Sequence, residues 1–309
     1  MPAATRDAFG EAIVRVGKDE RIVVLTGDLR DSTRTEDFAA KYPDRFVECG
    51  IAESNMLGIA SGLAMSGKIP WACSFSCFVT GRFETVRLSV AYQDANVRIV
   101  GTHTGIGVGE DGYSQMSLED IAMIRALPNV AVINPADAVE ADRAVEYLVD
   151  HEGPAFLRLT RQKVDDVNGA GYRFEFGKAV QLRDGTDVAL VATGATVAEA
   201  VKAAEALNGD GISARVLNVH TIHPLDEDAV LAAASDCRAI VTVEDHSVRG
   251  GLGSAVAEVL AQGDGAARLH VIGLRTFGES GTSEELYEKY GLAGDRIAET
   301  TRSFLGNLN

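Results

Sequence analysis

Short apolar runs alternate along the chain with longer segments of helical periodicity. In the first half, β-branched and apolar runs occupy residues 22–26, 97–101, 130–133 and 155–159. Continuous runs of this length are typical of strands buried on both faces, and helical segments between them imply crossover connections. The pattern therefore predicts an α/β fold, with a mostly parallel sheet flanked by helices.

The segment 137–150 is the clearest of the predicted crossover helices. Its apolar residues fall on one face at helical spacing, as expected of a helix that covers a sheet. These are Ala141, Val145, Leu148 and Val149. We expect the charged residues of the same segment to face solvent, namely Glu140, Asp142, Arg143 and Glu146.

The second half repeats the alternation on a smaller scale. Strand-like runs at residues 187–192, 214–219, 239–243 and 269–273 are separated by alanine-rich helical segments. Between the halves, the chain becomes polar and glycine-bearing, which suits a linker. A length of 309 residues also favours two domains. We predict domains at residues 1–165 and 179–309, joined by a linker at 166–178.

Charge and composition exclude several classes of protein. The net charge of −16, from 45 acidic and 29 basic residues, disfavours binding to nucleic acids and anionic membranes. No apolar run approaches the length of a spanning helix, so a cytoplasmic protein is expected. An anionic substrate would have to be bound by local arginines. The four scattered cysteines are expected to be structural thiols.

Three local patterns could carry chemistry. Glu53 opens an otherwise small and apolar helical segment, although an acid in a first helical turn ordinarily serves only the helix dipole. Phe75 and Phe78 lie where a strand gives way to a helix, and such a pair ordinarily packs in a core. A glycine-dense loop at 102–112 directly follows a predicted strand, at the end where α/β sheets bind ligands.

In this order and spacing, the three patterns resemble transketolase. The resemblance covers residues 5–305 and includes the segments 51–56, 103–112 and 159–162, with the Phe75/Phe78 pair. In the second half it includes 221–226 and the Glu-Asp-His triplet at 244–246 with the glycines at 250–253. It implies the C-terminal half of that enzyme, a pyrimidine-binding domain followed by the transketolase C-terminal domain, as one subunit of a split transketolase.

The resemblance also implies a cofactor and a set of site residues. The cofactor is thiamine diphosphate, shared with a partner subunit, and it supplies the carbanion-stabilising chemistry. Catalytic roles are implied for Glu53, which bonds the aminopyrimidine ring, and for His103. Cofactor-binding roles are implied for Glu53, Phe75, Phe78 and Asp28. Substrate-binding roles are implied for His103, Asp111, Arg161, Ser32, Arg6 and Gln115, and the arginines suit a sugar phosphate.

The sequence departs from the family pattern at two of these places. Gly81 stands where the family often has a tyrosine, which predicts a more open pocket edge. Gln115 stands where the family usually has a histidine, and glutamine cannot carry a proton. We therefore expect an unusual ketose or a specialised biosynthetic substrate.

The family's metal site is expected on another chain. The tripeptide Gly209-Asp210-Gly211 matches the first part of the diphosphate and metal motif, but no strand precedes it and Asn218 follows too soon. We interpret it as a helix-to-strand turn and predict no metal ligands in this chain. The implied partner is an N-terminal transketolase subunit that binds Mg²⁺ or Ca²⁺, in an α2β2 assembly.

Three alternatives remain open from the sequence. The chain could be the β subunit of a 2-oxo acid dehydrogenase E1 component, against which stand the loop at 109–112 and the Arg161-Gln162 pair. A fragment of a deoxyxylulose-phosphate synthase is disfavoured because that enzyme is ordinarily a single chain. A non-catalytic, transketolase-like partner protein is disfavoured by the joint presence of Glu53, Phe78, His103 and Asp111.

Overall fold

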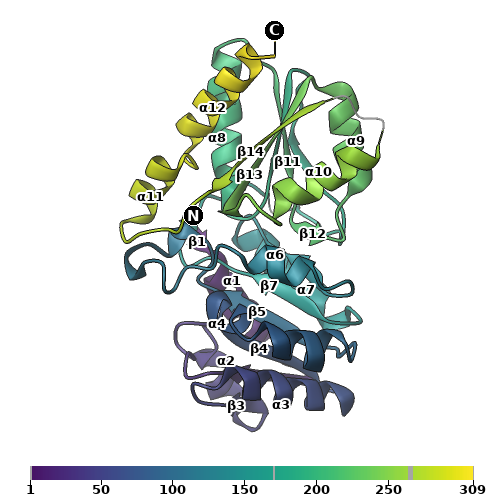
Figure 1. Ribbon diagram of the computed structural model, residues 1–309. Helices are drawn as coiled ribbons and strands as arrows, with labels where there is room; N and C mark the ends of the chain where they lie inside the picture. Colours follow the sequence, from purple (N-terminus) through teal and green to yellow (C-terminus); the bar gives the residue numbers. More distant parts are fainter. Residues whose placement is uncertain (1, 170, 264–266, 309) are drawn as a thin grey trace.

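The computed structural model describes residues 2–169, 171–263 and 267–308. It has two α/β domains, one above the other in Figure 1, and each has a central sheet with helices on both faces. Both sheets are mostly parallel, as the sequence predicts. No helix of the described ranges is long and apolar enough to span a membrane.

The lower sheet in Figure 1 has seven strands in the order β12-β6-β7-β5-β4-β2-β3. All are mutually parallel except β12, which is antiparallel to β6. The strands are β2 (Ile22–Thr26), β3 (Phe46–Glu48), β4 (Ile69–Phe75), β5 (Arg98–Thr102), β6 (Ala131–Ile133), β7 (Ala155–Arg158) and β12 (Thr221–His223).

Two apolar layers cover this sheet. One contains α1 (Thr5–Val16), α2 (Glu36–Lys41) and α7 (Ala138–Asp150), with Phe9 and Trp71 fully buried in it. The other contains α3 (Glu53–Met65), the π-helical segment η2 (Val86–Ala91) and α6 (Asp120–Arg125). Shorter elements complete the domain: β1 (Ala3–Ala4), η1 (Pro43–Arg45), α4 (Ser76–Thr80), α5 (Phe83–Thr85), η3 (Ile106–Asp111) and β8 (Lys163–Val164).

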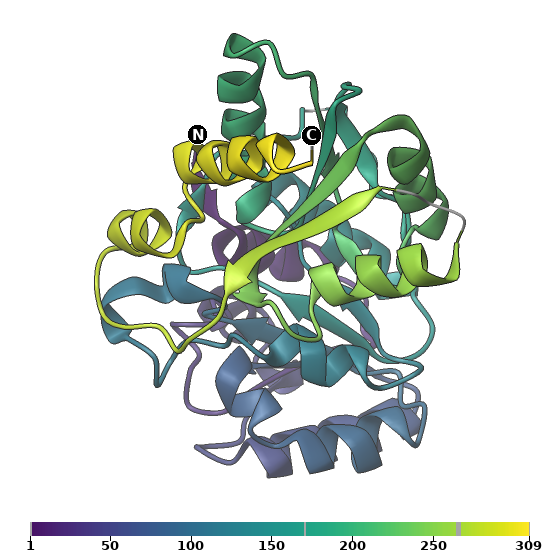
Figure 2. The same ribbon diagram turned by 45° about the horizontal axis from the view of Figure 1, so that its top comes forward.

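The upper sheet has five strands in the order β14-β13-β10-β11-β9. They are β9 (Val180–Arg183), β10 (Val188–Ala192), β11 (Ala214–Asn218), β13 (Ala239–Ser247) and β14 (Arg268–Leu274), and only β9 among them is antiparallel to its neighbour. In Figures 1 and 2, α8 (Thr196–Gly209) and α12 (Gly294–Gly306) lie on one side of the sheet. The opposite side carries α9 (Glu227–Asp236) and α10 (Leu252–Gln262), while α11 (Ser283–Tyr290) lies near the domain boundary.

Each strand predicted from an apolar run has a counterpart in the structure. The strands that the sequence did not predict include β3, β9 and β12, which lie at sheet edges and have polar residues within their short spans. An edge strand is covered on fewer sides, so its sequence lacks a continuous apolar run.

The expectation that Glu140 faces solvent is wrong. Its side chain is fully buried and accepts hydrogen bonds from Ala136 N (2.7 Å), Tyr172 Oη (2.5 Å) and Asn218 Nδ2 (2.9 Å). Tyr172 belongs to the linker and Asn218 ends β11, so this end of α7 is covered by the second half of the chain. Helical periodicity locates the face toward the sheet, but it does not reveal a second covered face.

The two halves are joined by more than the linker. Strand β12 follows β11 in the sequence, yet it pairs with β6 of the lower sheet, with Thr221 opposite Ile133. A strand from beyond the predicted linker therefore completes the first sheet. The linker at residues 166–178 stays a prediction.

Candidate active site

Several of the predicted site residues lie at the carboxyl ends of neighbouring parallel strands. Strands β2, β4, β5 and β7 are parallel and adjacent in the order β7-β5-β4-β2. Asp28 follows β2, Phe75 ends β4, His103 follows β5, and Arg161 follows β7. Because parallel strands end at one edge of a sheet, the fold brings these residues to the edge where α/β proteins bind ligands.

Glu53 is the first residue of α3 and is 4% exposed. Its Oε1 accepts a hydrogen bond from Ser74 Oγ (3.1 Å), at the end of β4. A Cβ at Gly27 would lie 3.4 Å from this oxygen, so glycine leaves the approach open. Ser74 is a neutral donor, and a ligand nitrogen that shares a proton would stabilise the buried carboxylate further.

Three rings form a stack at the same edge of the sheet. The centroids of Phe78 and Phe75 are 5.3 Å apart at 12°, and those of Phe75 and His103 are 3.7 Å apart at 21°. Phe75 is 8% exposed and lies between the other two rings. Phe78, on α4, is only partly buried. Phe78 therefore has the ring available to a ligand, and Phe75 supports it from behind.

The imidazole of His103 is held in one neutral form. Arginine can only donate, so the contact from Arg6 Nη1 (3.0 Å) makes Nε2 an acceptor, and Nδ1–H donates to Thr102 Oγ1 (2.9 Å). Burial, with smaller contributions from the positive charges of Arg6, Arg161 and Arg34, lowers the pKa of His103 to about 3. His103 therefore carries no proton charge near neutral pH, and a ligand that bonds Nε2 would replace the contact from Arg6.

Arg6 has spare capacity for an anion. Its Nη1 donates to the backbone oxygen of Ser32 (3.0 Å) as well as to His103. Its buried Nε has no hydrogen-bond partner among the described residues and forms a long ion pair with Asp7 Oδ1 (3.8 Å). Burial and the neighbouring Arg34 lower the pKa of Arg6. A buried donor that makes no hydrogen bond and lies near other positive charges favours a bound anion. Ser32, predicted at the phosphate end, is thus placed next to Arg6.

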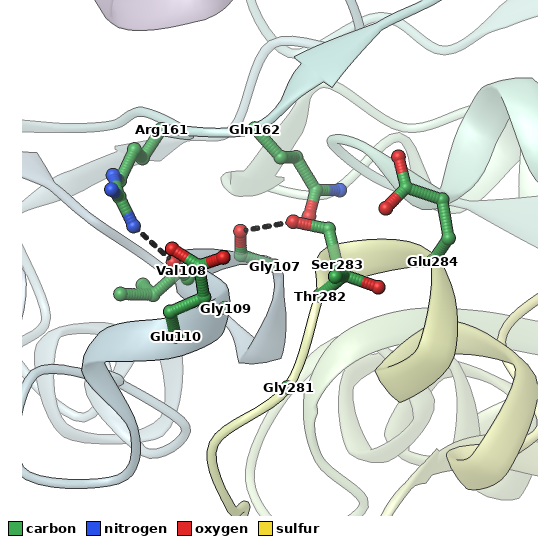
Figure 3. Close-up of a pocket in the computed structure, with 10 residues that line it drawn as sticks. All are labelled: Gly107, Val108, Gly109, Glu110, Arg161, Gln162, Gly281, Thr282, Ser283 and Glu284. Carbon is green, nitrogen blue, oxygen red and sulfur yellow. Dashed lines mark hydrogen bonds between the residues drawn. The ribbon is translucent and has the colours of Figure 1, made fainter.

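Arg161 and Asp111 form an ion pair at the glycine-dense loop. Arg161 Nη1 donates to the backbone oxygen of Val108 (2.6 Å) and lies 3.5 Å from a carboxylate oxygen of Asp111. Arg161 and residues 107–110 face residues 281–284 across a pocket of about 310 Å³ (Figure 3). Two of the predicted substrate-binding residues, Asp111 after β5 and Arg161 after β7, are therefore in direct contact.

Three other predicted positions are less closely connected. Asp28 is exposed, with φ of +62°, and its N–H donates to Glu48 Oε1 (2.7 Å). Gln115 lies beside α4, where its backbone oxygen accepts from Cys77 Sγ (3.4 Å). Gly81 ends α4 and is exposed. Their roles remain predictions.

The cysteines fit the structural role expected of them. All four are free thiols, and burial raises the pKa of Cys77 to about 12. Cys73 is fully buried and its pKa is also raised by burial. A thiol of this kind is unreactive because the thiolate is the nucleophilic form.

Some residues of the site were missed by sequence reasoning. Ser74 binds Glu53, Thr102 fixes the tautomer of His103, and Arg34 adds a third positive charge near it. Ser74 and Thr102 are strand-end residues, which a search for polar groups at strand ends could have found. Arg34 lies in an irregular loop with φ of +60°, and no sequence signal points to it.

The Gly-Asp-Gly tripeptide is a turn, as predicted. Gly209 ends α8, Gly211 has φ of +78°, and β11 follows, while Asp210 binds Arg302 Nε (2.5 Å). Within the described ranges, no group of three or more His, Cys, Asp or Glu side chains is arranged to hold a metal ion.

The fold and this sheet edge define a two-domain α/β protein whose first domain brings a buried acid and a stack of three rings to the carboxyl edge of its sheet. Residues 1–166 match the family model described as transketolase, pyrimidine binding domain, and residues 177–297 match transketolase, C-terminal domain. The chain therefore belongs to the transketolase family, whose members depend on thiamine diphosphate.

Similar proteins include transketolases encoded in two parts. A putative transketolase C-terminal section of Methanocaldococcus jannaschii is 45% identical, covering 95% of this chain and 94% of that protein. The 6-deoxy-6-sulfo-D-fructose transketolase subunit SqwH of a Clostridium species is 42% identical, covering 98% and 95%. A solved structure described as a split gene transketolase, inactive beta4 tetramer, is 41% identical with a TM-score of 0.91, covering 98% of each chain. These relatives disfavour the dehydrogenase alternative.

Proposed function

We propose that this chain is the C-terminal subunit of a split transketolase, which transfers a two-carbon ketol unit from a ketose to an aldehyde. The observation that carries the proposal is the buried Glu53 at the same sheet edge as the stack of Phe78, Phe75 and His103. The relatives that match this chain end to end are named as sections or subunits of transketolases. Because the match covers nearly the full length of these relatives, it supports a separate partner chain that binds the diphosphate and a metal ion, Mg²⁺ or Ca²⁺.

Glu53 would act on the pyrimidine ring of thiamine diphosphate. When bound, this cofactor supplies the stabilisation of the transferred two-carbon carbanion. Glu53 would share a proton with a ring nitrogen, because a buried carboxylate without such a partner is costly. Ser74 fixes Oε1 by its hydrogen bond, so the acid is oriented before the ring arrives. Phe78 would cover one face of the ring and keep water from the shared proton.

The far end of the sugar would meet the positive charges near His103. Arg6 offers a buried donor without a hydrogen bond, and Arg161 and Arg34 add charge in the same region. Neutral His103 would orient the substrate rather than move a proton to it. This arrangement favours a ketose with an anionic group at its far end, for which a phosphate is our first choice. Asp111, bound to Arg161, would limit the excess positive charge.

The test is ketol transfer by this chain mixed with its candidate N-terminal partner, with thiamine diphosphate and Mg²⁺. Donors would include a panel of ketose phosphates and a ketose sulfonate, because one relative is named for a sulfonated sugar. We expect turnover in the mixture and none from either chain alone. A stable complex that transfers no ketol unit from any donor would instead favour the non-catalytic partner protein.

A dimer of heterodimers is the proposed assembly. Closed twofold symmetry is common among oligomers, and a ring held between two kinds of domain needs both chains at each site. Mass measurement of the mixed complex in solution tests this stoichiometry directly.

A further inference from the structure

The glycine-dense loop of the candidate site is packed against the second domain. This loop, residues 103–118, begins at His103, includes Asp111 and returns to α6. Four of its apolar side chains are buried in the same cluster as the core of the upper sheet: Ile106, Val108, Met116 and Leu118. The second domain therefore supplies much of the apolar surface on which the loop rests.

A buried carboxylate from the second domain binds the backbone of the loop. Asp245, on β13, is 5% exposed, and its two oxygens accept from the N–H groups of Ile106 (2.8 Å) and Gly107 (3.4 Å). Gly105 has φ of +73°, and a Cβ there would lie 2.1 Å from Asp245 Oδ2. Glycine is required at this position both by the backbone conformation and by the approach of the acid.

Helix α11 completes the contact with the loop. Tyr287 Oη donates to Asp245 Oδ2 (2.9 Å) and accepts from Gln162 Nε2 (2.7 Å), next to Arg161. Ser283 Oγ donates to the backbone oxygen of Gly107 (2.9 Å), as the dashed line in Figure 3 shows. The N–H and the C=O of Gly107 are thus hydrogen-bonded by two side chains of the second domain, Asp245 and Ser283.

We propose that Asp245, Tyr287 and Ser283 are positioning residues, through which the C-terminal domain holds the loop that carries His103 and Asp111 in its substrate-binding conformation. None of the three is required to touch the substrate. His103 has φ of +56° and Asp111 ends η3, so the backbone between them decides where both side chains lie. A loosened loop would lower the affinity for substrate. This part of the inference depends on the proposed transketolase function, whereas the effect on the loop does not.

The first measurement is hydrogen exchange of the loop amides in the complex of this chain with its partner. Loss of one hydrogen bond corresponds to about a tenfold change in an opening equilibrium. We expect the amides of Ile106 and Gly107 to exchange about tenfold faster in Asp245→Asn and several-fold faster in Tyr287→Phe and Ser283→Ala. The matched control is Tyr290→Phe on the same helix, because Tyr290 Oη contacts Glu279 and Phe277 and not the loop.

The second measurement separates positioning from general stability. In Tyr287→Phe we expect KM for the donor to rise about tenfold while kcat stays within about twofold, with Tyr290→Phe unchanged in both. The proposal is overturned if Tyr287→Phe and Tyr290→Phe give the same loop exchange, or if kcat falls while KM is constant. If the wild-type complex transfers no ketol unit, the proposed function fails, and the exchange data still decide whether Asp245 and Tyr287 hold the loop.

Discussion

Buried acids at the boundary between the domains are surrounded by donors, whereas Glu53 at the edge of the first sheet is bonded to one neutral hydroxyl among the described residues. Asp245 receives two amides and a tyrosine hydroxyl. Glu244 receives the amides of Leu252 and Gly253 at the start of α10. Spare hydrogen-bonding capacity in a buried group needs an explanation, and here it coincides with the site that family membership indicates.

The same contrast applies to the cations. Arg158, at the boundary, donates to Asp120 Oδ2 (2.9 Å) and to the backbone oxygens of Ser117 and Asp245. Arg6, at the sheet edge, has a buried Nε that makes no hydrogen bond in the described part of the chain and lies 3.8 Å from Asp7 Oδ1. Arg158 and Asp245 thus bond groups across the domain boundary, whereas Glu53 and Arg6 keep hydrogen-bonding capacity that a ligand would use. The following predictions test this division.

The largest effect is expected from Glu53→Gln. Turnover of the complex should fall about thousandfold, because glutamine cannot share a proton with the ring in the same way. The unfolding temperature should change little, since Gln can still accept from Ser74. Activity assays and thermal unfolding of the same preparation check both parts. A large loss of stability with retained turnover would contradict the division.

Phe78→Ala should weaken cofactor binding about tenfold, in line with the value of one aromatic contact. Its effect on folding should be small because the ring is only partly buried. Phe9→Ala is the control, since Phe9 is fully buried in the core and its truncation costs about 3–5 kcal/mol of unfolding free energy. Titration of the complex with thiamine diphosphate and chemical unfolding distinguish the two. Equal effects of both variants on cofactor affinity would argue against Phe78 as the exposed ring.

A pH effect is expected from His246, which is fully buried at the boundary. Burial lowers its pKa to about 4, so its contribution to stability is present above its ordinary pKa of 6.5 and is lost as the pH falls toward 4. At pH 5 the loss should be on the order of 1–2 kcal/mol. Thermal unfolding at pH 7.5 and pH 5 should show a smaller acid loss in His246→Gln than in the wild type. Glu244 is unchanged in His246→Gln, so its own titration affects the wild type and the variant alike. An equal loss of stability at pH 5 in the two proteins would contradict the assignment of the effect to His246.

The smallest effect is expected from Gln115→His. Its side-chain contact is with Ser114 Oγ (3.5 Å), so the substitution should leave stability unchanged. We expect a several-fold shift in the relative kcat/KM values of the donors, because histidine can carry a proton and glutamine cannot. The same panel of ketose donors provides the measurement. An unchanged order and ratio of donors would refute our interpretation of this departure.

Much of the fold could be predicted because strands buried on both faces have continuous apolar sequences. The central strands β2, β5, β7, β10 and β13 were found in this way. The sheet edge that carries Phe75 and His103 followed from the same pattern, since the ends of parallel strands meet. The assignment of roles to Glu53 and Arg6 required resemblance to a family, because an acid or an arginine at a helix start has no pattern of its own.

The contacts between distant segments could not be predicted. Periodicity placed Glu140 on the outer face of α7 without showing that Tyr172 and Asn218 cover it. The Glu-Asp-His triplet was recognised as a family motif, yet the bonds of Asp245 to Ile106 and Gly107 depend on how the domains meet. Such pairings join residues 32 to 139 positions apart, which no local pattern encodes.

The pairing of β12 with β6 also affects how the chain emerges from the ribosome. The first sheet exposes the hydrogen-bonding edge of β6 until Thr221–His223 has been synthesised, well after the linker. An open strand edge in a nascent chain is prone to join other chains. The first half of this protein therefore depends on the prompt translation of the second half for a closed sheet edge, and a gene shortened at the linker would yield an aggregation-prone product.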